Sequence, residues 1–330
     1  MTETSGGVFA YRLDGKGGGR EVGGDRRENT AASEPIAPTV GLLWLHLDHE
    51  DPATRRWFEE ESGVDPVVYD ALLADETRPR SVARRDGLLV ILRGVNLNPG
   101  SDPEDMVSVR MWIEAHRVMT LRHRRVIAIQ DIREALDAGD GPTDAGEFVV
   151  EIADRLSSLM APVLSDVDDQ VDALEDQVLE AESFELRAKI GGLRRQVISL
   201  RRYLAPQRDA MARLQGERVS WLGELHREHL RELGDRITRY VEDLDAARDR
   251  AAVAQDELNS RLAEQMNKTM YMLSIIAGIF LPLGLLTGLL GINVGGIPGT
   301  ENPVAFTIVC ALLFAVALIQ VWIFRRFKWI

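Results

Sequence analysis

Two long apolar runs dominate the C-terminal part of the chain. Met270–Ile292 and Pro303–Phe324 contain no charged residue. Each is slightly longer than the roughly 20 apolar residues that a transmembrane helix needs, so the pattern predicts two transmembrane helices. The alternative is a pair of buried helices in a soluble protein, but such helices nearly always keep a polar face.

The charges that flank these runs predict their direction. Lys268 precedes the first run, and the basic tail 325–330 follows the second, whereas the segment 293–302 between them has no Lys or Arg. By the positive-inside rule, both termini are cytoplasmic and the segment between the runs is an external loop. The sequence therefore predicts a multi-pass protein of the plasma (inner) membrane, with its second span at 303–324.

The middle of the chain shows a helical period only. Residues 143–225 are expected to form a helical hairpin region, with a break at Pro206. From His226 the pattern continues without proline as far as Pro282, inside the first apolar run. We therefore expect one stalk helix over 226–292 that continues into the membrane, about 100 Å long at 1.5 Å per residue.

The N-terminal part contains segments with the two-residue period of strands and segments with the helical period. Residues 39–142 contain strand-like runs at 42–47, 87–98 and 105–126, with proline-initiated helices between the first two. Residues 1–38 are glycine-rich with few large apolar side chains and are expected to be a disordered tail. The predicted fold class is α+β, with an N-terminal α/β domain, a helical stalk and two C-terminal transmembrane helices.

Composition excludes several classes of function. The net charge of −13 argues against general nucleic-acid binding and is compatible with attracting cations. Cys310 is the only cysteine, so neither a disulfide framework nor a CxxC zinc site can form within one chain. The sequence has no P-loop pattern. We expect a protein that is not an enzyme and has no cofactor, driven by an ion or proton gradient or by the membrane potential.

One face of the stalk helix carries small or weakly polar residues into the membrane. Steps of three or four place these residues on one face: Asp256, Ser260, Ala263, Asn267, Met270, Ser274, Ala277, Leu281, Gly284 and Gly288. Two helices cannot enclose a polar path, so a pore along this face would need an oligomer. The same pattern also suits a packing seam between membrane helices.

The segment after the first run adds a neutral polar group. Gly291, Ile292 and Asn293 end the span, and carboxamide oxygens from a ring of subunits could hold a hydrated cation. Glu301 is the only charge predicted on the outer side, where it could concentrate cations. A Gly- and Asn-rich segment is also simply typical of a turn.

These residues resemble a known family. The stretch "YMLSIIAGIFLPLGLLTGLLGINVGGIPG" and the basic end "FRRFKWI" look like CorA-type divalent-cation transporters. "RGVNLNPGSDPEDMVSVRMW" and "RRYLAPQRDAM" look like the ZntB-type zinc transporter branch. The resemblance implies a homopentamer in which the N-terminal domains form a cytoplasmic funnel, the long helices line the pore and the second spans form an outer ring.

The resemblance also implies roles for single residues. Asn293 falls at the selectivity loop. The family lines or gates its pore at the positions of Asp256, Met270, Leu273, Leu281 and Gly284. Ile292 stands where magnesium channels of the family have Met, and glycines replace the acidic residue that usually follows the triplet. These departures favour zinc transport over magnesium conduction.

Resident metal ligands are sparse. His226 and His229 have helical i, i+3 spacing and could hold a surface zinc, although a solvated helix face is the commoner outcome. His46 and His49 are expected on opposite faces of a strand. Three functions remain open: a transporter of zinc and related divalent cations with protons as a further partner, a CorA-type magnesium/cobalt channel, and a membrane-anchored coiled-coil scaffold or sensor.

Overall fold

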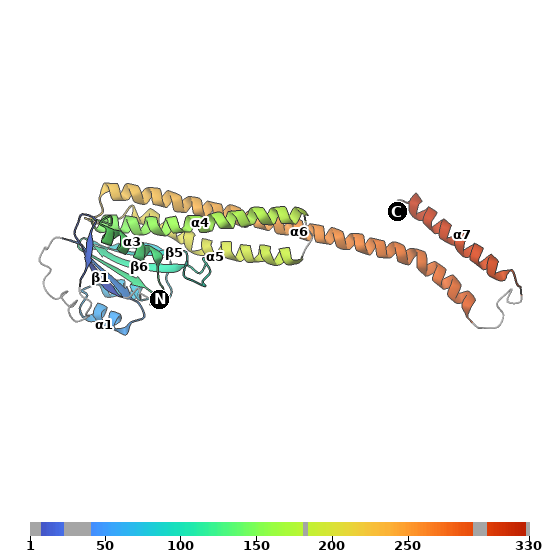
Figure 1. The fold of residues 1–330 in the computed structure, drawn as a ribbon, viewed down its shortest axis with the longest axis horizontal. Helices are drawn as coiled ribbons and strands as arrows, with labels where there is room; N and C mark the ends of the chain where they lie inside the picture. Colours follow the sequence, from blue (N-terminus) through green and yellow to red (C-terminus); the bar gives the residue numbers. More distant parts are fainter. Residues whose placement is uncertain (1–7, 23–40, 181–183, 293–301, 328–330) are drawn as a thin grey trace. The chain divides into compact units, whose positions relative to one another are not determined.

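The computed structural model describes residues 8–22, 41–180, 184–292 and 302–327, which fall into two compact units, 1–255 and 256–330. The first unit contains a seven-stranded mixed sheet in the order β2-β1-β3-β7-β6-β5-β4 (Figure 1). Only β3 and β7 are parallel, and all other neighbours are antiparallel. The strands are β1 (Phe9–Leu13), β2 (Gly19–Glu21), β3 (Leu43–Asp48), β4 (Arg80–Arg84), β5 (Gly87–Gly94), β6 (Val107–Glu114) and β7 (Arg117–Arg122).

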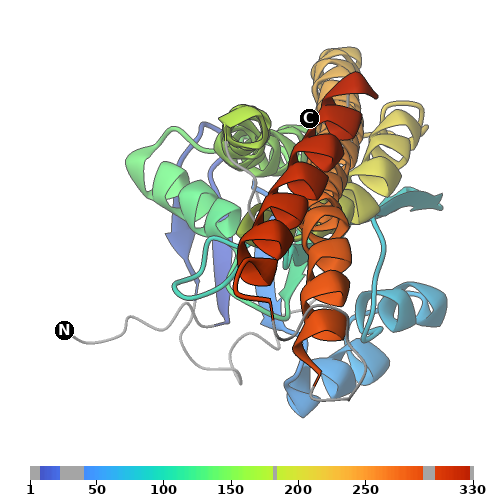
Figure 2. The ribbon, with the colours of Figure 1, turned by 90° about the vertical axis from the view of Figure 1, so that its right-hand side faces the viewer.

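Helices cover both faces of this sheet. The helices are α1 (Pro52–Glu60), α2 (Pro66–Leu72), α3 (Ile127–Ala138), α4 (Ala145–Glu180), α5 (Phe184–Leu214), α6 (Glu224–Gly291) and α7 (Ala305–Arg326). α1 and α2 lie on one face and α3 and α4 on the other (Figures 1 and 2). Because both faces are covered, the interior strand β5 is apolar and buried from Leu88 to Leu92.

Alternation along the strands divides the core into two layers. Leu89 and Ile91 of β5 pack with Phe58 of α1 and Val68 of α2. On the opposite face, Trp44 of β3 meets Phe148 of α4 with ring centroids 5.0 Å apart. Each layer buries large side chains. Each Å² of apolar surface removed from water stabilises the fold by about 25 cal/mol.

The prediction that residues 1–38 are a disordered tail is wrong for residues 9–21. β1 and β2 form a hairpin there, and Phe9 and Tyr11 are buried. The glycines that suggested disorder serve the turn, because Gly15 and Gly17 adopt φ of 75° and 96°. The Asp14 carboxylate accepts hydrogen bonds from the backbone N–H groups of Lys16 and Gly18. Residues 1–7 and 23–38 lie outside the described residues.

The predicted helix break at Pro206 is also wrong, because α5 continues to Leu214. A proline inside a helix removes one backbone hydrogen bond. Burial of Leu204, Ala210 and Met211 on both sides of it stabilises the continuous helix. α4 likewise contains Pro162, and α6 contains Pro282.

Candidate functional site

The predicted pore residues lie on α6, in the second unit. The path face is defined as Asp256, Ser260, Ala263, Asn267, Met270, Leu273, Ser274, Ala277, Leu281, Gly284 and Gly288. Every member is exposed in the single chain except Ala277, which is half-buried. The face therefore has no partner element within the described part of one chain, and it is available to other copies or to an ion path.

α7 packs against a different side of α6. A Cβ atom on Gly278 would lie 3.0 Å from Cζ of Phe324, so the two helices approach closely at this glycine. Ile275, Ile279 and Leu286 are half-buried on the same side. At about 100° per residue, this side is roughly 140° around the helix from the path face. α7 therefore leaves the path face open.

The chemistry of the path face is weakly polar within the apolar run. The Ser274 hydroxyl donates to the Met270 carbonyl at 2.8 Å, which leaves its oxygen lone pairs available to water or a cation. Asn267 adds an exposed carboxamide before the run, whereas Leu281 is an apolar constriction candidate, 71% exposed. From Asn267 to Gly288 this face has no charged side chain. Such a face suits an ion that keeps much of its water.

The Gly-Ile-Asn triplet is only partly described. Gly291 is the last residue of α6, and Ile292 follows it with an exposed side chain. Asn293 and Glu301 lie outside the described residues, so their predicted roles stay predictions. Around Gly284, Gly288 and Gly291, an added Cβ atom would meet no heavy atom of the described chain within 4 Å. These glycines leave room for close approach by a neighbouring copy.

The histidine pair lies at the start of α6 in the first unit. His226 is half-buried, its Nδ1 accepts from the Gly223 N–H at 3.2 Å, and its Nε2 lies 3.7 Å from a carboxylate oxygen of Asp144. His229 is exposed. Among the residues that the structure places, no group of three or more His, Cys, Asp or Glu could hold a metal ion. A zinc site at this pair remains a prediction.

A cluster of carboxylates on α4 has a basic partner on α6, which was not predicted from the sequence. Arg250 of α6 forms ion pairs with Asp168, Asp172 and Glu175 of α4, at 3.0 Å for Asp168. Hydrogen bonds to Glu175 and then Asp172 raise the pKa of Arg250. The signal was the spacing of the three acids by four and three residues, which places them on one helix face.

Two described helices are long and apolar enough to span a membrane, α6 and α7, and their apolar windows are not buried in the chain. Exposed apolar surface of this extent needs lipid or other subunits around it. Both agree with the two spans expected at 270–292 and 303–324.

Comparison with known proteins gives a consistent family. Residues 40–326 match the family described as CorA-like Mg2+ transporter protein. The chain is 43% identical over 325 residues to "Divalent cation transporter CmaX" of Pseudomonas aeruginosa, covering 98% of this chain and 96% of that protein. It is 37% identical over 328 residues to "Zinc transport protein ZntB" of Yersinia pseudotuberculosis, covering 99% and 97%. The structure of the full-length CmaX protein superposes with a TM-score of 0.83 at 42% identity and covers both chains fully. The chain belongs to the CorA-like Mg2+ transporter family.

Proposed function

We propose that the chain carries divalent cations, zinc among them, across the inner membrane through a pore that several copies form around the path face. The observation that carries the proposal is the open path face of α6, which is uncharged from Asn267 to Gly288 and which α7 leaves uncovered. The names of two relatives that the chain matches almost end to end, a divalent cation transporter and a zinc transport protein, support the choice of cargo.

The proposed assembly is a homopentamer with both termini in the cytoplasm. α6 would line the pore and α7 would lie outside it, since α6 carries the path face and continues from the stalk. Asn293 would present neutral oxygens at the external mouth, and Glu301 would attract cations there. A detergent-corrected mass near five times the 36.8 kDa of one chain is expected; a mass of one or two chains would contradict the proposal.

The first prediction concerns Asn293. In liposomes with an internal zinc dye, the purified protein should give zinc influx above empty liposomes, under imposed pH and voltage gradients. Asn293→Ala should reduce or deregulate this flux several-fold, because the ring of carboxamides is lost. Thr307→Ala is the matched control: Thr307 is an exposed polar residue of α7, and its loss should leave flux unchanged.

Two results would overturn the proposal. Zinc flux no greater than that of empty liposomes would exclude transport under these conditions. Equal flux in wild type and Asn293→Ala would remove the role of the loop and favour a membrane-anchored scaffold or sensor.

A magnesium channel is the second candidate, and the family description favours it. Competition between zinc and magnesium uptake in the same liposomes discriminates the two. Inhibition of zinc entry only by a large excess of magnesium supports zinc transport, whereas a strong preference for magnesium reverses the ranking.

A further inference from the structure

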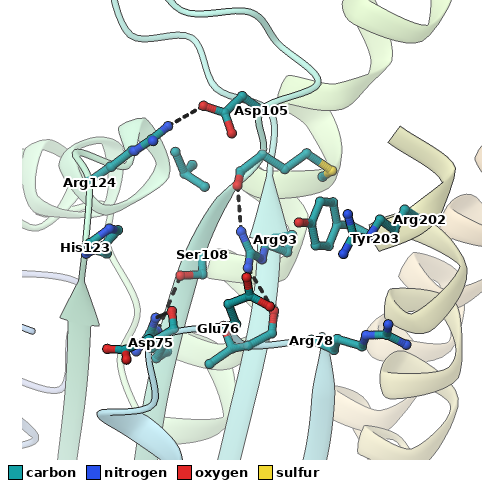
Figure 3. A pocket seen from close by; sticks show the side chains of 14 residues that line it. Asp75, Glu76, Arg78, Arg93, Asp105, Ser108, His123, Arg124, Arg202 and Tyr203 are labelled. Carbon is teal, nitrogen blue, oxygen red and sulfur yellow. Dashed lines mark hydrogen bonds and ion pairs between the residues drawn. The ribbon is translucent and has the colours of Figure 1, made fainter. Parts of the chain in front are cut away.

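An arginine-rich pocket lies in the first unit, and the proposed transport path does not use it (Figure 3). It encloses about 280 Å³ beside the ends of β5 and β6 and against α5. Its charged lining consists of Arg78, Arg93, Arg110, Arg124, Arg202, Asp75, Glu76, Asp105 and His123. The arginines outnumber the carboxylates, so the pocket carries excess positive charge.

Arg110 places a positive charge deep in this pocket. Its side chain is only 1% exposed. It donates to the carbonyl oxygens of Leu72, Ala74 and Asp75, at 2.7, 2.6 and 3.3 Å, and weakly to Ser108 Oγ. Within the described ranges, no carboxylate forms an ion pair with it. Desolvation, followed by repulsion from Arg93, lowers the pKa of Arg110 to about 10.

Arg93 has hydrogen-bonding capacity left over. It donates to the carbonyl oxygens of Met106 at 2.7 Å and Thr77 at 2.8 Å, and its guanidinium lies 4.5 Å from the centre of the Tyr203 ring. A guanidinium has five N–H donors, so three remain, including a buried Nε–H without a partner in the described chain. The Thr77 hydroxyl, in a side chain 6% exposed, also lacks a partner there.

The other charges of the pocket do not neutralise this pair. Arg124 is paired with Asp105. Arg202 lies 5.6 Å from the centre of the Tyr203 ring and, in the part of the chain the structure covers, forms no ion pair. Asp75 and Glu76 line the same pocket, but both are exposed, so water screens them. Buried charge without a counter-ion is costly, and an anion that bound here would offset that cost.

We propose that this pocket binds a phosphate group, either free or as a phosphomonoester. Arg93 and Arg202 would contact its oxygens, the Thr77 hydroxyl would donate to one of them, and Arg110 would supply charge from below. Guanidinium groups match the oxygen geometry of phosphate and form charge-assisted hydrogen bonds with it. The site is independent of transport, so either proposal can fail alone. The competing account is that Arg93 and Arg110 only fasten the segment after α2 to the sheet through its carbonyls.

The test is calorimetric titration of the full-length protein in detergent at fixed ionic strength. One arm uses inorganic phosphate and the other glycerol 3-phosphate, and tighter binding in either arm identifies the source of the group. We expect saturable binding, weakened about tenfold by Arg93→Lys, which loses the planar fork, and about threefold by Thr77→Val, which loses one donor. The matched control is Arg133→Lys, since Arg133 also lies over aromatic rings, those of Phe9 and Tyr11, but outside the pocket.

The control variant Arg133→Lys is expected to bind phosphate with the affinity of the wild type. The proposal is overturned if wild type shows no saturable binding of either compound, or if Thr77→Val and Arg93→Lys both bind as wild type does. Thermal unfolding establishes that each variant is folded. If Arg93→Lys fails to fold, the affinity of Thr77→Val decides between the two accounts. This substitution keeps the volume of the side chain, and the Thr77 hydroxyl has no hydrogen-bond partner in the described chain.

Discussion

At the scale of single residues, His46 shows how burial decides the role of a histidine. Its side chain is 3% exposed in β3, and its Nδ1 lies 2.8 Å from the Thr120 hydroxyl, which also accepts from the Trp44 indole N–H. Desolvation, with a smaller contribution from Arg122, lowers the pKa of His46 to about 3. The imidazole is therefore a neutral core group over the physiological range.

This pKa predicts a pH dependence of stability. The unfolded chain binds a proton at His46 near pH 6.5, while the folded chain does so only near pH 3. Stability is therefore lost as pH falls through that window, by about 2–3 kcal/mol between about pH 6.5 and about pH 4.5. His46→Phe keeps a ring against Phe9. The substitution should remove this part, about 2–3 kcal/mol, from the dependence of the free energy of unfolding on pH.

Thermal unfolding of the full chain in detergent, measured at several pH values, checks this prediction. Carboxylates contribute to the slope in both proteins, so the difference between the two curves is the quantity to compare. Parallel curves for wild type and His46→Phe would show that His46 does not titrate differently in the two states.

At the scale of elements, α4, α5 and α6 of the first unit are joined by long-range ion pairs. Arg250 pairs with three acids of α4, Arg236 pairs with Asp154 of α4 at 2.9 Å, and Arg201 of α5 pairs with Asp245. Most of these side chains are about a third exposed or more, so each pair contributes modestly. The cluster around Arg250 differs because three negative charges share one positive charge.

Loss of the Arg250 charge should leave the three carboxylates of α4 to repel one another. Arg250→Gln is expected to lower the free energy of unfolding by about 1 kcal/mol, and added salt should reduce the effect. Arg55→Gln is the control, because Arg55 pairs only locally with Glu59 in α1 at 3.8 Å. Its cost should be a few tenths of a kcal/mol at most. Equal, small effects of the two substitutions in thermal unfolding would contradict the prediction.

Sequence periodicity predicted the helices better than the edge strands. The strand-like run expected at 105–126 contains β6 and β7, and the stalk helix begins within two residues of its expected start. β4 was missed because its sequence, Arg80–Arg84, is charged, as edge strands often are. β1 was missed because its five residues lie between glycine-rich segments, and pairing with β2 and β3 makes it a strand.

The path face could be listed from sequence, but its neighbours could not. A 3.6-residue period defines faces of a helix without saying which one another helix covers. The side of α6 that meets α7 depends on the contact of Gly278 with Phe324, 46 residues away in sequence. The arginine pocket was equally hidden, because Arg93, Arg110 and Arg202 come from three elements whose approach depends on the sheet and on α5.

At the scale of the whole molecule, the proposed assembly requires water beside the path face. In a Cys310→Ser background, the near-isosteric Ser274→Cys places a thiol on that face. Ile279→Cys places one toward α7. The thiolate attacks the sulfur of the reagent and displaces a sulfinate, and the thiolate forms only in contact with water. Ser274→Cys should therefore react with a water-soluble methanethiosulfonate at least tenfold faster than Ile279→Cys.

Mass spectrometry of the protein in liposomes measures the two rates. A faster reaction at Ile279→Cys would show that the side of α6 in contact with water faces α7, which would contradict the proposed path. Divalent cations added in excess should slow the reaction at Ser274→Cys if the same face carries the ion.

The unbroken helix from Asp256 to Gly288 also restricts which length changes the gene can tolerate. Each residue rotates the helix by about 100°. Deletion of one residue between Asn267 and Ser274 would therefore turn the part of the path face before the deletion by about 100° relative to the part after it. A deletion of seven residues changes the direction by only about 20°. Insertions and deletions that preserve activity in this segment should therefore be close to a whole number of helical turns, such as about seven or eleven residues. Single-residue changes of length should abolish activity even where every remaining side chain is retained.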